Sequence, residues 1–266
     1  MIRVLCSLLA VAGLSSAQGM EARGRKIIDD AIAALGGEKF LTMQDRIETG
    51  RAYSFFHDQL SGLSVAKIYT RYIPVAPGRT GIDLGVQERQ AFGKKEDYYV
   101  LFRQEGAWEV TFRGRKELEK DRVQRYRDTT LNNFFYILRQ RLHEPGLIFE
   151  SPGSDVIENQ PVDVVDITDS QNRVVRVYFH QTTKLPVRQS WIWRDPQTKE
   201  RDEEVTRFSR YRPTNGIQWP QQMLRERNGE KTYEIFSETV TVNQGLADDL
   251  FLVPGPDARP APPRKK

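Results

Sequence analysis

A repeated pattern of short strand-like segments and tight turns constrains the fold of this chain more than any other feature. Asn215-Gly216 and Asn228-Gly229 each join two segments of alternating apolar and polar residues, and Glu105-Gly106 does the same earlier in the chain. Such dipeptides are typical of turns between antiparallel strands. Longer turn sequences lie at 169–172 and 195–198. The pattern predicts strands at 46–56, 63–73, 97–104, 107–114, 163–168, 173–180, 185–195, 203–212, 216–227 and 231–242.

Two segments show helical periodicity instead. In 21–35 the apolar residues recur every three or four positions, and Gly36-Gly37 follows as a stop signal. In 115–142 the first half is nearly all charged, whereas the second half places apolar residues on one stripe until Glu144-Pro145-Gly146. We therefore expect an amphipathic first helix and a second helix in the middle of a β protein.

These elements predict a mainly β (α+β) fold. About ten antiparallel strands must form a strongly twisted sheet that curls to bury its inner face, and an apolar helix can fill the concavity. The sequence of 266 residues has 38% hydrophobic side chains, enough for a substantial core. No linker interrupts the pattern, so we expect a single domain over 18–254.

The first residues have the features of an export signal. Met1 to Arg3 is a short basic segment, Val4 to Leu14 is apolar but too short to remain in a bilayer, and Ser15-Ser16-Ala17 offers a cleavage site. We predict a signal peptide over 1–17, cleavage near Ala17, export through the Sec pathway to the periplasm and no transmembrane segment in the mature chain. The single cysteine, Cys6, lies inside this signal, so the mature chain has no disulfide or thiolate chemistry.

Charge argues against nucleic acid as a partner. The formal net charge is +4, but Arg3 leaves with the signal and the tail after Pro254 carries a net +3, which leaves the body without net charge. Binding to a phosphate backbone needs a clustered basic face. The proline-rich basic tail, 255–266, is predicted to be disordered.

Catalytic motifs are missing from the sequence. His57, His143 and His180 are dispersed and lack metal-ligand spacing, and Gly93-Lys94-Lys95 does not complete a phosphate loop. The sequence also has no G-x-S-x-G elbow. We predict a protein that is not an enzyme and has neither metal nor cofactor. The alternative is an exported, hydrolase-like enzyme whose site is assembled from dispersed histidines and carboxylates.

The second half of the chain resembles a known family. A strand is followed by a Phe-x-x-x-Thr-x-x-Pro-like turn and further antiparallel strands, and the domain ends with an asparagine, an acidic turn and a phenylalanine. The residues that carry this likeness are Phe179, Thr183, Leu185, Pro186, Asn243, Asp248, Asp249 and Phe251. In this order, behind an export signal and a first helix, the sequence resembles the LolA/LolB-like superfamily of periplasmic lipoprotein carriers, as a divergent member.

The resemblance implies an unclosed barrel of about eleven strands, lidded by helices, with an apolar cavity for lipid or lipoprotein acyl chains. It implies a soluble, monomeric, non-catalytic carrier or chaperone whose partners include the lipoprotein-sorting machinery of the inner and outer membranes. The charged segment 115–128 and the basic tail have no counterpart in this family.

Aromatic and aliphatic residues on the second helix and on three strands are the candidates for the cavity lining. Most such side chains fill a core, and a cavity is lined by the subset that the sheet cannot pack. The cavity candidates are Leu131, Phe134, Phe135, Leu138, Tyr98, Phe102, Phe179, Trp191 and Trp193. Arg176, Arg188 and Arg194 lie near them in the sequence and are candidates for holding a polar headgroup.

Overall fold

The computed structural model describes residues 2–74, 84–194 and 199–255, with side chains from residue 18 onward. The predicted turn at 195–198 and nearly all of the predicted tail lie outside the described residues. Helix α1 spans Ile2–Leu35 and α2 spans Glu38–Leu41. The predicted signal and first helix are thus one helix here, and the cleavage site stays a prediction. None of the helices formed by the described residues combines the length and apolar character that spanning a membrane would need.

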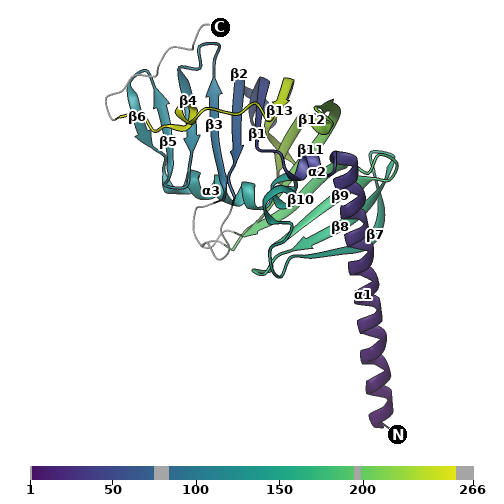
Figure 1. The fold of residues 1–266 in the computed structure, drawn as a ribbon. Coiled ribbons are helices and arrows are strands. Elements are labelled where there is room, and N and C mark those ends of the chain that lie inside the picture. The colour runs from purple at the N-terminus through teal and green to yellow at the C-terminus, as the bar shows by residue number, and fades with distance from the viewer. Residues whose placement is uncertain (1, 75–83, 195–198, 256–266) are drawn as a thin grey trace.

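The described strands form one antiparallel sheet (Figure 1). Its strands are β1 (Asp45–Phe56), β2 (Gln59–Tyr72), β3 (Val86–Phe92), β4 (Tyr98–Phe102), β5 (Ala107–Thr111), β6 (Gly114–Glu117), β7 (Ile148–Ile157), β8 (Gln160–Thr168), β9 (Val174–His180), β10 (Pro186–Arg194), β11 (Arg201–Thr214), β12 (Ile217–Arg227) and β13 (Glu230–Val242). Their order is β6-β5-β4-β3-β2-β1-β13-β12-β11-β10-β9-β8-β7. The edge strands β6 and β7 do not pair with each other, so the sheet is not closed. The predicted mainly β, open and helix-lidded fold is confirmed, with 13 strands rather than about eleven.

Turn residues set the register of the sheet. Asn215 and Gly216 have φ values of 49° and 83°, and Asn228 and Gly229 have 52° and 84°. Two successive residues with positive φ form the turn whose twist matches that of an antiparallel pair. The β11-β12 and β12-β13 hairpins therefore begin where the sequence predicts.

The predicted helix over 115–142 is wrong as one continuous element. Its first residues belong to β6, and α3 spans Lys120–Leu131. Helix α4 then spans Phe134–Tyr136 and continues as a π-helical turn, Ile137–Arg141. The chain breaks at two asparagines because Asn132 Nδ2 donates back to the carbonyl of Asp128 (2.8 Å), while Asn133 Oδ1 accepts from the amide of Tyr136 (3.1 Å) and begins a new helix.

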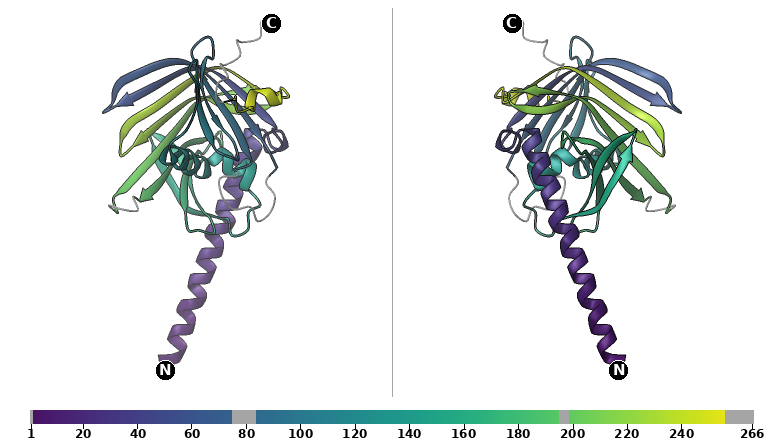
Figure 2. Two further views of the ribbon diagram at one scale, coloured as in Figure 1. Left: turned by 90° about the vertical axis from the view of Figure 1, so that its left-hand side faces the viewer. Right: turned by 90° about the vertical axis from the view of Figure 1, so that its right-hand side faces the viewer.

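The sheet curves around the helices, which lie on its inner face (Figure 2). The C-terminal half of α1 packs against β7 and β8 and buries Ile28 and Leu35 completely. This approach is close, since a Cβ at Gly24 would lie 2.4 Å from the carbonyl oxygen of Phe149. Helix α4 adds Phe134 to the same core, against Phe179 of β9, with ring centroids 5.2 Å apart.

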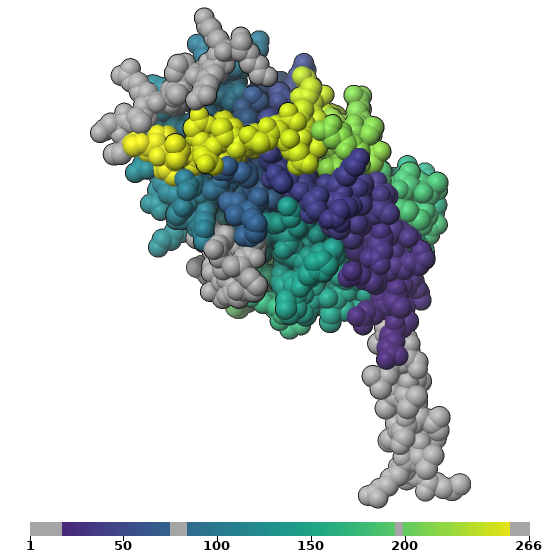
Figure 3. Space-filling view, in the orientation of Figure 1, coloured from purple at the N-terminus to yellow at the C-terminus, as the bar shows by residue number. Residues whose placement is uncertain are grey.

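The C-terminal segment covers part of the outer face of the sheet. After β13 the chain crosses β1 to β5, as the yellow segment in Figure 3 shows, and forms the 3-10 turn Asp248–Phe251 there. Phe251 is 1% exposed and packs in a second core with Tyr69 and Leu101. Both faces of this half of the sheet are therefore covered, one by α3 and the other by the segment that follows β13.

Candidate functional site

A cavity of about 590 Å³ lies between α3 and the inner face of the sheet. Strands β1 to β4 and β11 to β13 form its floor and walls, and α3 and α4 cover it. We call it the concave cavity. Its volume lies within the range of small-molecule binding sites, about 300–1,000 Å³.

Helix α3 covers the concave cavity without being built into the core. None of its residues is fully buried. Tyr126 stacks on Phe102 of β4, with ring centroids 3.6 Å apart and planes within 8°. Arg122 pairs with Glu109 at 3.2 Å, and Arg125 pairs with Glu204 of β11 at 2.8 Å. The aromatic stack, the packing of Val123 against the small core around Val100 and Leu118, and two partly exposed ion pairs therefore hold the cover.

The junction between α3 and α4 is fixed far more firmly. The Gln189 side chain is 2% exposed, accepts from the Phe134 amide at 2.9 Å and donates to the Asn132 carbonyl at 3.0 Å. The Tyr136 hydroxyl donates to the Leu84 carbonyl at 2.8 Å. These buried contacts anchor α4, so α3 is attached at its C-terminal end to a rigid support.

Apolar side chains form much of the wall of the concave cavity. Phe135 of α4 packs on Trp219 of β12, with centroids 4.9 Å apart. The sheet contributes further apolar side chains from five of its strands. Those that the structure places at the cavity include Ile68, Val86, Phe102, Met223 and Ile235.

The floor of the same cavity is charged. Arg46 is 8% exposed and donates to Glu48 (2.7 Å), to the Tyr72 hydroxyl (3.0 Å) and to Thr70 (3.2 Å). Its guanidinium also lies 4.1 Å from the centroid of Trp219. These contacts place a satisfied ionic group directly beside the aromatic wall.

Glu88 extends this polar network across β3. Its carboxylate accepts from Gln90 Nε2 at 2.6 Å and from Thr70 Oγ1 at 3.3 Å. Burial raises the pKa of Glu88 above its ordinary value, and the bond from Gln90 and the charge of Arg46 offset this only in part. For Arg46, burial lowers the pKa, but Tyr72 and the carboxylates of Glu48 and Glu88 outweigh it and raise the pKa. The cavity floor thus stabilises the charged form of Arg46 and disfavours the charged form of Glu88.

A cluster of arginines lies where α3 meets β11 and β12. Arg227 pairs with Asp202 and lies 3.9 Å from Glu204, which also binds Arg125. Arg225 lies deeper, over the Tyr233 ring at 5.7 Å, and among the described residues it makes no ion pair within 4 Å. The concave cavity is therefore amphipathic, with an apolar wall and a cationic end.

The structure places the predicted cavity residues in three environments. Phe134, Leu138 and Phe179 are at most 1% exposed and lie inside the main core. Phe102 and Phe135 are buried and also line the concave cavity. Four others are at least partly exposed and do not line it. These are Leu131, Tyr98, Trp191 and Trp193.

The predicted headgroup arginines are not brought together. Arg176 is bound by both oxygens of Asp166, at 2.7 Å each, on the outer face of β9. Arg194 is exposed at the end of β10. Arg188 lines a pocket that is separate from the concave cavity.

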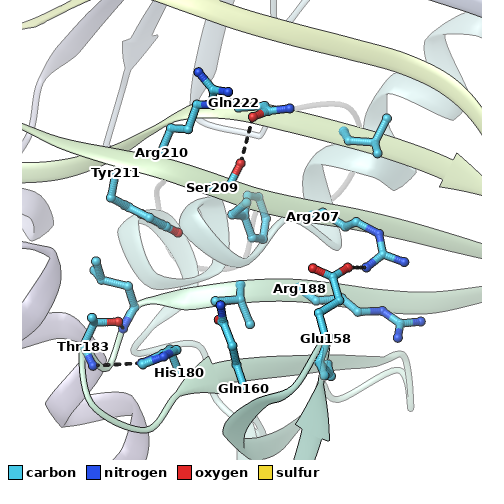
Figure 4. A pocket seen from close by; sticks show the side chains of 15 residues that line it. Glu158, Gln160, His180, Thr183, Arg188, Arg207, Ser209, Arg210, Tyr211 and Gln222 are labelled. Atoms are coloured by element: carbon cyan, nitrogen blue, oxygen red, sulfur yellow. Dashed lines mark hydrogen bonds and ion pairs between the residues drawn. The ribbon is translucent and has the colours of Figure 1, made fainter.

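This second pocket, of about 410 Å³, lies where the β7-β8 hairpin tip and the β9-β10 turn meet β11 and β12 (Figure 4). We call it the hairpin pocket. It contains His180, whereas His57 pairs with Glu230 at the β1-β2 turn and His143 is exposed after the π-helical turn. In the described part of the chain, no group of three or more histidine, cysteine, aspartate or glutamate side chains is placed to hold a metal ion.

Sequence reasoning missed the ionic floor of the concave cavity. Arg46, Glu48, Thr70, Glu88 and Gln90 lie on the inner face. The first three fall in segments that were predicted as strands without a role in a cavity, and the segment of Glu88 and Gln90 was not predicted as a strand. In β1 and β3 the available signal was spacing, because Arg46 and Glu48, and likewise Glu88 and Gln90, are separated by one position and so point to the same face. That signal does not reveal which face is covered.

Comparison with known proteins identifies solved structures with a similar fold. No family model and no curated protein sequence matches the chain. Among solved structures, a DUF1329 family protein from Desulfovibrio piger matches with a TM-score of 0.55 and 15% identity, over 86% of this chain and 97% of the other. A putative outer membrane lipoprotein-sorting protein domain from Vibrio parahaemolyticus matches with 0.55 and 13%, over 87% and 97%.

A LolA superfamily protein from Nitrosomonas europaea matches with a TM-score of 0.44 and 10% identity, over 86% of this chain and 97% of the other. The two structures at 0.55 share the fold at very low sequence identity. The chain therefore has the fold of these two proteins, an open antiparallel sheet lidded by helices as its sequence predicts, although its sequence differs greatly from theirs.

Proposed function

We propose that this protein is a non-catalytic binding protein that carries an amphiphile, such as a lipid or a lipoprotein acyl chain, in the concave cavity. The observation that carries the proposal is the cavity itself, which combines an apolar wall with a cationic end beneath a weakly held helix. Moving an apolar chain from water to the wall formed by Phe135 and Trp219 would lower the free energy. A polar headgroup would lie toward Arg225.

Similarity of the fold to that of a solved structure supports this proposal. One structure with a similar fold is described as a putative outer membrane lipoprotein-sorting protein domain. With the predicted export signal, this favours a periplasmic carrier acting between the inner and outer membranes. Its predicted partners are lipid or lipoprotein acyl chains and the proteins that deliver and receive them.

The weakly held α3 suggests how a ligand enters. The stack of Tyr126 on Phe102 and the Arg125–Glu204 pair can open without disturbing the buried α4 anchor at Gln189. Exposed ion pairs contribute little to stability, about 0–1 kcal/mol each. Displacing α3 would open the part of the concave cavity that this helix covers.

The test is native mass spectrometry with lipid extraction, on protein purified from a periplasmic fraction without detergent. Ile68 lines the concave cavity, and Val65 lies on the opposite face of β2, 38% exposed. We expect an acyl lipid with the wild type and with Val65→Trp, but much less with Ile68→Trp, whose indole fills the cavity. Charged substitutions of Phe134 or Leu138 would be poor tests because both lie in the core.

Two results would contradict the proposal. One is a ligand-free mass for the wild type together with no uptake of a hydrophobic fluorescent probe. The other is equal lipid content in Ile68→Trp and Val65→Trp, which would place the lipid outside the concave cavity. Circular dichroism of both variants should match the wild type, so that loss of lipid reports on the cavity.

A further inference from the structure

Arg225 differs from the other arginines that line the concave cavity. Four lining arginines are already paired with carboxylates. These pairs are Arg46–Glu48, Arg122–Glu109, Arg125–Glu204 and Arg227–Asp202. Arg225 lines the same cavity and is half-buried, yet it has no hydrogen bond or ion pair with any described residue. Its positive charge is therefore available to a ligand.

Tyr233 adds a second donor beside Arg225. The two residues are directly opposite each other in the β12-β13 pairing, and both line the concave cavity. Opposite residues of an antiparallel pair project from the same face, and the guanidinium lies 5.7 Å from the centroid of the Tyr233 ring. The hydroxyl has no hydrogen bond to the described part of the chain. Burial raises the pKa of Tyr233 to about 12, so this hydroxyl keeps its proton and can donate.

Glu88 is the carboxylate that faces these two donors across the cavity. The charge of Arg225 acts to lower the pKa of Glu88, but within the described residues the two groups form no ion pair. The Glu88 oxygens accept from Gln90 and Thr70 instead, and burial disfavours the ionised carboxylate. An unpaired cation and a neutral donor thus face a carboxylate whose charge is disfavoured. This balance favours an incoming anion over an incoming cation.

We infer that the cargo of the concave cavity is an anionic amphiphile whose carboxylate or phosphate headgroup is bound by Arg225 and Tyr233. This inference rests on the function proposed above and adds the charge of the headgroup. The oxygens of the anion would accept a charge-assisted hydrogen bond from the guanidinium and a second hydrogen bond from the hydroxyl. The apolar chain would lie along the wall that includes Phe135, Met223 and Ile68.

The test is isothermal titration calorimetry of lipid-free protein with probes that have similar chains and different headgroups. The probes are decanoate, decyl phosphate, decyltrimethylammonium and decyl glucoside, each below the concentration at which it forms micelles. At least one anionic probe should bind about tenfold more tightly than the cationic and neutral probes. Arg225→Gln should raise the dissociation constant of that anionic probe by about ten- to hundredfold, because it removes a charged hydrogen-bond donor.

Four further variants separate the headgroup site from other effects. Tyr233→Phe keeps the ring beside Arg225 and should raise the same dissociation constant by about three- to tenfold, which keeps the test open if Arg225→Gln folds poorly. Arg210→Gln is the matched control, since Arg210 is exposed and does not line the concave cavity. It should bind like the wild type. Glu88→Gln should bind anions at least as tightly, because it removes a like charge. Ile68→Trp should abolish binding of every probe.

The outcomes distinguish this inference from the proposed carrier function. Anion-selective binding that Arg225→Gln weakens and Arg210→Gln does not supports the inference, and the better anionic probe identifies the headgroup as carboxylate or phosphate. Equal binding of all probes, lost in Ile68→Trp but kept in Arg225→Gln, overturns the inference and leaves the carrier function standing. Preference for decyltrimethylammonium, weakened in Glu88→Gln, also overturns it. Absence of binding by every probe contradicts both.

Discussion

The charged residues of the concave cavity distinguish this protein from a carrier with a purely apolar interior. Arg46 and Glu48 are 8% and 1% exposed and paired at 2.7 Å, and Ser237 donates to the second Glu48 oxygen at 2.8 Å. Buried charges persist only when paired and hydrogen-bonded. Because this pair lies beside Trp219, the concave cavity presents apolar and polar surfaces next to each other.

At the residue scale, we predict that Glu88→Gln changes how stability depends on pH. Burial raises the pKa of Glu88, so its ionisation opposes folding. The free energy of unfolding of the wild type should fall, relative to that of the variant, as pH rises from the ordinary glutamate pKa through the raised one. The measurement is urea unfolding of both proteins across about pH 4 to 8.

Glu117→Gln is the matched control, because Glu117 is exposed at the end of β6. The free energy of unfolding of this variant should change with pH as that of the wild type does. If the difference in free energy of unfolding between Glu88→Gln and the wild type stays constant with pH, Glu88 ionises in the folded protein as it does in the unfolded chain.

At the scale of elements, the ten predicted strands are all present, but β3, β6 and β7 were missed. The sequence of each of these strands departs from the usual strand pattern. β3 (VQERQAF) places polar residues on the covered inner face, and β6 (GRKE) is short and charged. β7 contains Pro152 and Gly153, which are tolerated because β7 is an edge strand with a register shift at that point.

Helix α3 should be the most easily opened element that touches the concave cavity. Tyr126→Ala removes the stack on Phe102, and aromatic pairs contribute about 0.5–1.5 kcal/mol beyond burial. We expect the α3 amides to exchange about three- to tenfold faster in this variant, with little change in α4, as measured by hydrogen–deuterium exchange mass spectrometry.

Gln124→Ala is the control within the same helix, since Gln124 is exposed and bonds only to Asp128 among the described residues. It should leave α3 exchange nearly unchanged. Unaltered exchange in Tyr126→Ala would mean that α3 is held by contacts other than the stack.

At the scale of the whole molecule, the two ends of the described chain close opposite faces of the sheet. The C-terminal half of α1 covers the inner face near β7, and the segment after β13 covers the outer face of β1 to β5. Asp45, at the start of β1, holds this segment by accepting from the amides of Gln244 (2.7 Å) and Gly245 (2.8 Å). Arg71 adds a contact with the Phe251 ring at 4.5 Å.

The C-terminal segment should therefore stabilise the sheet. Phe251→Ala is expected to lower the free energy of unfolding by about 3–5 kcal/mol, since it empties a fully buried site. Leu252 is 59% exposed, and Leu252→Ala should change stability by less than about 0.5 kcal/mol. Urea unfolding measures both, and equal effects would show that the segment is not part of the cooperative fold.

The sequence by itself determined most of the strands, the first helix and the fold class. Turn dipeptides and alternating polarity are local signals, so they located ten of the strands, the first helix and the LolA-like order of the second half. The tertiary structure alone decided which apolar residues fill the core and which charged residues face the concave cavity. Alternation places a residue on one of two faces, but only the positions of α3, α4 and the C-terminal segment decide which face is covered, and those positions depend on contacts between residues far apart in the chain.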